Sequence, residues 1–408
     1  MWSRCRSPVY FHLSQKPWSE VDGQHGNRCT LAGHILYLRV AGLWPHAQAT
    51  RYLLHTVMVQ LCAIAYIAVG VASIYTARGD VDGISHTLMH LLEVVSGMVK
   101  AGLFFSKRQS FYRLVQDLDL MVSEDWDRPE LESARRWARR MTVSLTAYIY
   151  TLILLWLPAP LLAGGDQKLL PVVQIEGVDW SLWPGAYAAL YALQCAVLLT
   201  QVPVVIGLDC FFVAAMLHVA ALLQLLGQRV SELQLINGGV ADLAGDVGLK
   251  RRQVLYAELC TCIVNHQKIT KYLRDLEAAM STMVLVQLST NMICLCMGLY
   301  QQIQIKDALT ALQYAMVLPF HSTQIYFYCW TADIITQQGE ALSEAAYSSH
   351  WVGAGTGFQR ALCIVMARAH KPLLITAGHL YPVNTAAFVA LMKASYSYYT
   401  LLRQLDGD

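Results

Sequence analysis

Charged residues are scarce in this sequence, and so are the motifs that mark enzymes. Asp, Glu, Lys and Arg make up 14% of the 408 residues, against about 25% in a typical soluble domain. The net charge of +2 lacks the strong basic excess of a nucleic-acid-binding protein, so we predict no nucleic-acid partner. HExxH, GxSxG and P-loop motifs are all absent, and we therefore expect neither an enzyme nor a cofactor.

Disulfide and metal-binding patterns are weak as well. The eleven cysteines are an odd number without a framework spacing, so we interpret them as small apolar residues of a membrane core. Cys260-Thr-Cys262 followed by His266 lacks the second CxxC or HxxxH pair of a zinc site, and we expect no metal. The GAGTG stretch at 353–357 has no lysine and no preceding strand pattern, which favours a cytoplasmic turn over a phosphate loop.

Long apolar runs account for much of the remaining sequence. Each reaches the ~20 residues that cross a bilayer as a helix. Five runs carry no charge: 52–75, 141–163, 184–208, 278–305 and 308–332. Two more hold few charges: 84–105, with Glu93 and Lys100, and 380–402, with Lys393. The first thirty residues contain no signal-peptide core, so the first run should itself direct insertion. The expected fold class is an all-α polytopic membrane protein.

The stretch 184–228 leaves the number of spans open. It contains a single charge, Asp209, in 45 positions. As one helix it would measure about 68 Å at 1.5 Å per residue, which is twice the ~30 Å thickness of the hydrocarbon layer. It forms either two spans that turn around Pro203, Gly207 and Asp209, or one long helix that projects into water.

The distribution of lysine and arginine separates these two possibilities, because basic residues concentrate in cytoplasmic segments. The basic segments are 1–51 with six such residues, 106–140 with eight, 229–277 with seven and 333–371 with three. The intervening segments hold one each, at Arg78, Lys168 and Lys306. Basic and non-basic segments alternate strictly if 184–228 crosses once. We therefore predict seven transmembrane helices with the N-terminus inside and the C-terminus outside, and cytoplasmic extensions of helices 4 to 6.

Two other membrane-protein classes fit this pattern less well. A G-protein-coupled receptor has its N-terminus outside, and this chain has no DRY triplet and only PVNTAAF at 382–388 in place of NPxxY. A small-molecule transporter is the main alternative. It usually shows repeated halves with broken helices, and no internal repeat is visible here.

Four motifs in the sequence are distinctive. They are LRVAGLWP at 38–45, YCWTAD at 328–333, EALSEAAYSSHW at 340–351 and RALCIVMARAHKPLLITAGHLYPVNTAAFVALMKASYSYYTLL at 360–402. In combination they resemble the insect odorant receptors. The first is similar to that family's N-terminal motif, the next two to its sixth helix and the segment beyond, and the last to its bipartite seventh helix.

The resemblance implies an odorant receptor that is a tuning subunit of a non-selective cation channel, opened by a small volatile organic ligand. Such subunits form heterotetramers with a shared co-receptor in the plasma membrane of sensory dendrites, in contact with membrane lipid, with split seventh helices around a central pore. We expect a cytoplasmic segment at 1–51, then transmembrane helices 1 to 6 with a ligand pocket in their outer halves at 52–332. A cytoplasmic anchor should follow at 333–377, and a pore-lining helix with an extracellular C-terminus at 378–408.

The last apolar run carries polar residues at helical spacing. On a helix, a stripe of Lys393, Ser397, Thr400 and Gln404 lies opposite Val389, Met392, Tyr396, Tyr399 and Leu402. Lipid cannot satisfy such a stripe, so it faces water or protein, and the alternative to a pore is packing within the same subunit. The resemblance adds a hydrophobic gate of two leucines. The predicted pore lining is Lys393, Ser397, Thr400, Leu401, Gln404 and Leu405.

The ligand pocket is expected where the outer halves of helices 2, 3, 4 and 6 meet, because volatile ligands need an apolar, aromatic lining with few polar groups. The predicted lining is Met89, His90, Tyr148, Leu152, Trp156, Tyr187, Tyr191, Gln194, Tyr314, Val317 and His321. The outer loop 164–183, with Trp180 and Trp183, should cover this pocket. Glu93 and Lys100 lie on one helix face and either pair with each other or join an internal polar network.

Overall fold

The structure is a computed structural model. It describes residues 29–44, 49–77, 81–123, 125–162, 169–175, 177–233, 246–304, 308–349, 351–352 and 354–406. Most of the predicted segment 1–51 and the basic residues Arg78, Lys168 and Lys306 lie outside these described residues.

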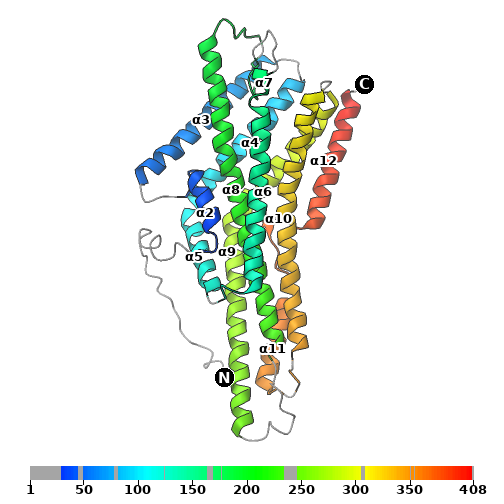
Figure 1. Cartoon of the computed structure of the whole chain (residues 1–408). Helices are drawn as coiled ribbons and strands as arrows, with labels where there is room; N and C mark the ends of the chain where they lie inside the picture. The colour runs from blue at the N-terminus through cyan, green and yellow to red at the C-terminus, as the bar shows by residue number, and fades with distance from the viewer. Residues whose placement is uncertain are drawn as a thin grey trace.

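Long helices form an elongated bundle (Figure 1). The helices that contain all or most of each of the seven expected spans are α3 (Ala49–Thr76), α4 (Val81–Ser106), α6 (Pro129–Trp156), α8 (Pro184–Ser231), α9 (Asp246–Gln304), α10 (Ala308–Ser348) and α12 (Thr385–Asp406). Shorter helices lie between or before them: α2 (Ala32–Val40), α5 (Arg108–Ser123), α7 (Ala159–Leu162) and α11 (Thr356–Ala369). Within the described residues, five of the long helices, α3, α4, α6, α8 and α9, are apolar enough by composition to cross a membrane. The crossings of α10 and α12, and with them the count of seven, stay predictions.

The stretch that left the span count open is one continuous helix. α8 contains 48 residues and runs through Pro203 without a break. Every residue from Pro203 to Leu223 is buried, because α2, α4, α6, α9 and α10 all pack around it. A helix that is apolar on all sides requires such complete enclosure. α8 is therefore the central element of the bundle (Figure 1).

The long extensions of α8, α9 and α10 reach the lower end of the bundle (Figure 1). α8 packs on α9 and α10 there, and α11 packs on α9 and α10. In the predicted tetramer, contact between subunits would bury the apolar surface of these extensions. The single chain already buries much of it, because the neighbouring helices of the same chain enclose the lower half of α8.

The expectation of an all-helical fold needs one correction. Two short strands, β1 (Thr376–Ala377) and β2 (Tyr381–Pro382), pair antiparallel between α11 and α12. The connecting turn places Gly378 at φ 62° and His379 at φ 58°, the left-handed conformation that tight hairpin turns need. A Cβ on Gly378 would also lie 2.5 Å from Cδ2 of Leu285 on α9. This hairpin is what splits the last helical region into two parts.

Candidate functional site

Aromatic rings from three helices meet in the upper half of the bundle. His86 and His90 of α4 have ring centroids 4.9 Å apart, and Trp156 of α6 lies 5.6 Å from His90. Tyr314 of α10 lies 5.5 Å from Trp156 and 5.5 Å from His86. Met89 is buried against Tyr314 and Trp156. We call these five residues the aromatic cluster. Their edge-on contacts are each worth about 0.5–1.5 kcal/mol beyond simple burial.

Polar groups lie one turn further along α4 from this cluster. The Glu93 carboxylate is 3.4 Å from Nδ1 of His321 on α10 and accepts a hydrogen bond of 3.8 Å from the Cys294 thiol of α9. The same His321 nitrogen is 3.3 Å from Oδ1 of Asn291. The thiol also lies 3.8 Å from the carbonyl oxygen of Met89, so the polar groups and the aromatic cluster adjoin.

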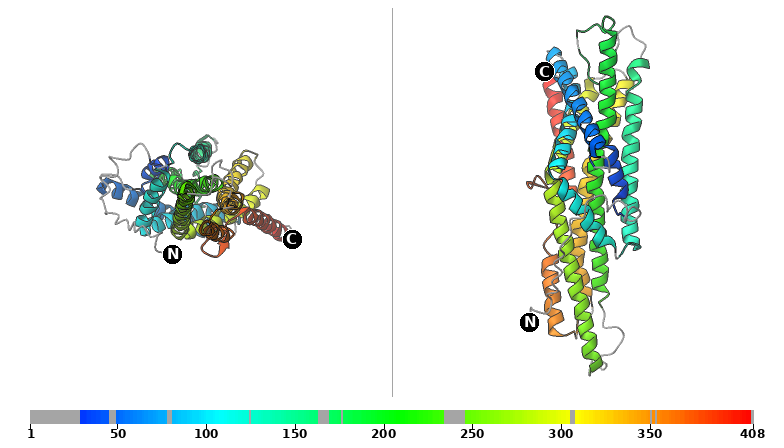
Figure 2. Two further views of the ribbon diagram at one scale, coloured as in Figure 1. Left: turned by 90° about the horizontal axis from the view of Figure 1, so that it is seen from below. Right: turned by 90° about the vertical axis from the view of Figure 1, so that its left-hand side faces the viewer.

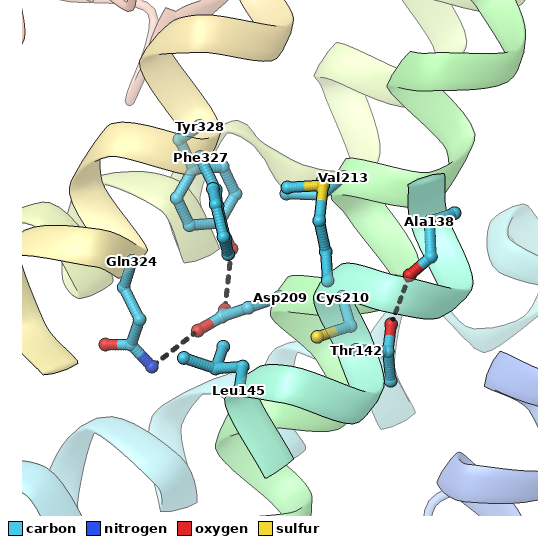
Figure 3. Close-up of a pocket in the computed structure, with 10 residues that line it drawn as sticks. Ala138, Thr142, Leu145, Asp209, Cys210, Val213, Gln324, Phe327 and Tyr328 are labelled. Carbon is cyan, nitrogen blue, oxygen red and sulfur yellow. Dashed lines mark hydrogen bonds between the residues drawn. The ribbon is translucent and has the colours of Figure 1, made fainter. Parts of the chain in front are cut away.

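These polar groups continue into a chain of buried side chains. Gln287 of α9 donates to Asn291 Oδ1 at 2.7 Å and contacts Oε1 of Gln324 at 3.0 Å. Gln324 of α10 reaches Asp209 of α8 at 3.5 Å. Figure 3 shows Gln324 and Tyr328 converging on this aspartate, to which the Tyr328 hydroxyl donates at 2.6 Å.

Lys100 closes the far end of this polar chain. Its ammonium group lies 2.6 Å from Oδ1 of Asp209, and its side chain is 0% exposed. The pair joins α4 to α8 in the interior, where both side chains are buried. Glu93 and Lys100 therefore do not pair with each other but occupy opposite ends of one network over four helices. Ionisable groups inside membrane helices are expensive and are usually functional.

A small cavity lies beside Asp209 (Figure 3). Its lining includes Ala138, Met141, Thr142, Leu145, Cys210, Val213 and Phe327. The volume is about 10 Å³, which is room for about one water molecule. An organic ligand does not fit there, so this cavity belongs to the polar network and is not a ligand pocket.

The last helix stands at the edge of the bundle. α12 is at the margin in both the side view and the view from below (Figures 1 and 2). Ser395 is 2% exposed, and the Cys296 thiol of α9 donates to its carbonyl oxygen. Lys393, Ser397 and Gln404 are exposed. α12 thus uses one narrow face for its own subunit and presents polar residues outward.

Comparison with known proteins decides the family. The model of the 7tm odorant receptor family matches residues 80–396. The chain belongs to the odorant receptor family. It is 26% identical to odorant receptor Or2 of Anopheles gambiae over 73% of this chain and 78% of that protein, and 21% identical to Or1 of the same mosquito over 92% and 95%. The olfactory receptor OR5 of Machilis hrabei, solved in complex with eugenol, has the same fold, with a TM-score of 0.77 and 16% identity over 92% of this chain and 97% of that one.

Membership in this family gives the chain's class. It is an odorant receptor of the olfactory system and not an enzyme, and its apolar helices make it a multi-pass membrane protein.

The receptor places some of the predicted ligand residues together and others apart. Met89, His90, Trp156 and Tyr314 all belong to the aromatic cluster, and His321 adjoins it. His86 and Cys294 also lie here but were not predicted. His86 could have been predicted as a member of this cluster, because it lies four residues before His90 and shares its helix face. Cys294 has no such signal in the sequence.

Three other predicted residues lie on α8 and bond to the backbone of segments outside that helix. Gln194 accepts hydrogen bonds from the backbone N–H of Val172 at 2.9 Å and donates to the carbonyl of Val173 at 2.9 Å. The Tyr187 hydroxyl donates to the carbonyl of Leu169 at 3.0 Å, and the Tyr191 hydroxyl bonds the carbonyl of Leu157. The amide and hydroxyl groups of these residues are satisfied by backbone partners, so these contacts are structural, and the role of the three residues in a ligand pocket stays a prediction.

The remaining predicted pocket residues and the outer loop lie near the contact of α6 with α10 and along α8. The Tyr148 hydroxyl donates to the carbonyl of Met316, Leu152 is 5% exposed and Val317 is half-buried. In the outer loop, Trp180 packs against Tyr187, while Trp183 is 66% exposed. The described part of the loop covers α3, α4 and α8 through Val172 and Val173.

The predicted pore residues differ in exposure. Thr400 is half-buried, and Leu401 is 51% exposed. The side chain of Leu405 lies outside the described residues. On the side predicted to face away from the pore, Tyr396 is 62% exposed and Val389 is 43% exposed. The rest of the subunit therefore leaves part of the apolar side of α12 uncovered as well.

Proposed function

We propose that the chain is the odorant-tuning subunit of a ligand-gated, non-selective cation channel that assembles with a shared co-receptor as a heterotetramer. The observation that carries this proposal is the polar face that α12 leaves uncovered at the margin of the subunit. Lipid cannot hydrogen-bond to the exposed Lys393 or Gln404, so this face requires water or other subunits. The exposed Ser397 lies on the same face, and its hydroxyl donates to the carbonyl of Lys393. Four such helices around one axis would provide an aqueous path for cations.

The hydrophobic gate of this pore would consist of Leu401 and Leu405. The two positions are one helical turn apart, and rings of leucine close a narrow pore by excluding water. The exposed position of Leu401 on α12 supports this role.

The odorant would bind at the aromatic cluster. This cluster offers apolar ring faces for a small volatile molecule, and Glu93 and His321 supply polar groups at one end. The tightly packed rings would have to separate to admit a ligand, and that separation would move α4, α6 and α10 relative to each other.

A short stretch of α9 supports a route from ligand to pore. Cys294 contacts the polar end of the ligand region through Glu93, while Cys296, two residues later, contacts Ser395 of α12. A shift of α9 at Cys294 would therefore reach the pore helix directly. Both contacts lie within one helical turn, so α9 need not bend to transmit the movement.

The assembly would sit in the plasma membrane with seven spans, the N-terminus inside and the C-terminus outside. The lower ends of α8, α9 and α10, with α11, would form the cytoplasmic anchor of the tetramer. The alternation of basic segments supports this orientation, and the packing of α11 on α9 and α10 supports the anchor.

Current recordings test the proposal. The chain is expressed with and without the co-receptor and exposed to a panel of volatile ligands. We expect ligand-evoked currents that reverse near 0 mV in mixed sodium and potassium solutions, and only with the co-receptor present. Robust currents from the chain alone, or none with both subunits at the surface, would contradict it.

A further inference from the structure

Three metal-ligating side chains from three helices converge in the receptor's interior. Among the described residues, Glu93 of α4, Cys294 of α9 and His321 of α10 form a group whose ligand atoms all lie within 4.8 Å of one another. We propose that these three side chains bind a divalent transition-metal ion of the zinc class. The site is separate from the zinc-like sequence pattern of Cys260-Thr-Cys262 and His266.

The spacing of the ligand atoms suits a tetrahedral ion. Zinc bonds of about 2.0 Å to nitrogen and oxygen and about 2.3 Å to sulfur place an oxygen and a nitrogen about 3.3 Å apart, and a sulfur and an oxygen about 3.5 Å apart. The Glu93 carboxylate oxygen lies 3.4 Å from Nδ1 of His321 and 3.8 Å from the Cys294 sulfur. Both separations are within a few tenths of an ångström of the bound geometry. The third, between the His321 nitrogen and the Cys294 sulfur, is at most 4.8 Å and would have to shorten when an ion binds.

Charge balance favours an ion at this depth. A divalent cation bound by one thiolate, one carboxylate and one neutral imidazole has no net charge. A neutral complex avoids the large cost of burying an isolated charge in a low-dielectric interior. Binding releases the proton of the Cys294 thiol to solvent and any proton held by Glu93 or His321, because each ligand must be deprotonated.

The donor set narrows the choice of metal. One sulfur, one nitrogen and one oxygen suit zinc, whereas magnesium and calcium prefer oxygen alone. Three protein ligands also leave a fourth position open. His90 lies three residues before Glu93 on the same face of α4, and its buried Nε2 has no hydrogen-bond partner in the described part of the chain. His90 is not in the group whose ligand atoms lie within 4.8 Å of one another, so its ring would have to turn toward the ion to supply the fourth ligand.

A bound ion would tie α4, α9 and α10 together beside the aromatic cluster. Because Cys296 contacts α12 two residues after Cys294, the ion would also restrain the segment of α9 that touches the last helix. Metal binding at this site requires neither an odorant nor a co-receptor. A test of the metal site is therefore independent of the proposed channel function.

Cobalt(II) spectroscopy of the full-length receptor tests the site. The purified chain in lipid nanodiscs is treated with a chelator and titrated with Co²⁺, a spectroscopic substitute for zinc. We expect one equivalent to produce a near-ultraviolet sulfur-to-cobalt charge-transfer band and visible bands of four-coordinate intensity, both removed by Zn²⁺. Cys294→Ser should abolish the charge-transfer band. Cys296→Ser is the matched control, a buried cysteine two residues along the same helix, and should keep it.

The titration has definite outcomes. The proposal is refuted if the wild-type chain shows no sulfur-to-cobalt band, or if Cys294→Ser leaves the band unchanged. In the second case, loss of the band in Cys262→Ser would show that the ion binds at Cys262 instead. If size-exclusion chromatography shows that Cys294→Ser is misfolded, Glu93→Gln replaces it. Loss of a residue that hydrogen-bonds to a metal ligand weakens metal binding by up to about 100-fold. Loss of the ligand Glu93 itself should therefore weaken Co²⁺ binding by at least that factor. Unchanged affinity in a folded Glu93→Gln receptor would likewise refute the site.

Discussion

The ion pair between Lys100 and Asp209 allows a direct test of how the interior is held together. Asp209→Asn removes the negative charge but keeps a side-chain oxygen of the same size. The amide oxygen can still accept the hydrogen bond from Tyr328, which is 2.6 Å from the carboxylate in the native protein. The variant therefore isolates the loss of charge opposite a lysine that is 0% exposed.

The separation of the charges sets the scale of the effect. At 2.6 Å between Nζ and Oδ1 and an effective dielectric constant of about 20, the attraction between the two charges is about 6 kcal/mol. Part of this attraction offsets the desolvation of the carboxylate in the native protein. The net destabilisation by Asp209→Asn should therefore be about 3–5 kcal/mol, the usual result of leaving a buried charge without its partner.

Thermal unfolding of the purified receptor, with surface expression as a second measurement, tests this figure. The double variant Lys100→Met with Asp209→Asn removes both charges and should recover most of the lost stability. Glu132→Gln is the matched control, because Glu132 pairs with Arg136 at 3.3 Å but both side chains are more than half exposed, so the change should be at most about 1 kcal/mol. A double variant as unstable as Asp209→Asn alone would refute the reasoning.

The remaining predictions concern topology, the pore, the ligand and pH. A C-terminal tag should be stained on intact cells and an N-terminal tag should not; C-terminal staining only after permeabilisation would contradict seven spans. Currents through Ser397→Cys channels should become sensitive to a charged thiol reagent, whereas Ser395→Cys, at a position 2% exposed, should stay resistant; equal sensitivity of the two would argue against the pore face. Trp156→Ala removes two ring contacts of 5.5 and 5.6 Å, so the odorant concentration for half-maximal current should rise about tenfold or more; an unchanged dose-response curve for every active ligand would place the pocket elsewhere. Burial lowers the pKa of His34 from 6.5 to about 4, so the native state disfavours its protonation: the stability is complete above pH 6.5 and about 3 kcal/mol is lost as the pH falls through 4. His34→Gln should reduce the difference in melting temperature between pH 7.5 and 4.5, the exposed His379→Gln should not, and equal pH dependence in all three proteins would count against this role.

Hydropathy alone predicted most of the helices correctly. The apolar runs at 52–75 and 84–105 lie within the single helices α3 and α4, whereas the run at 141–163 continues past the end of α6 at Trp156 into the short helix α7. Stretch 184–228 was ambiguous by length, and the charge distribution selected the single helix that α8 forms. These features follow from the local composition of each segment, because a run of apolar residues needs no knowledge of its neighbours to favour a buried helix.

The candidate site was predicted only in part. Met89, His90 and Trp156 were expected to line the ligand pocket on the basis of depth and residue type. The structure brings them together in the aromatic cluster, and their role in ligand binding stays a prediction. Gln194 fitted the same criteria, yet the backbone of Val172 and Val173 satisfies its amide. Depth in the membrane can be counted along a helix, but the direction in which a side chain points also depends on how that helix is rotated against its neighbours.

The sequence by itself determined that this chain is a helical membrane protein, where its apolar segments lie and, through four motifs, which family it belongs to. Tertiary structure alone decided that Lys100 meets Asp209 and that Glu93 meets Cys294 and His321. The physical reason is that hydrophobicity and basic charge act segment by segment along the chain. An ion pair or a cluster of ligands instead requires helices far apart in sequence to pack at one depth and rotation, and this depends on the shapes of all the side chains between them.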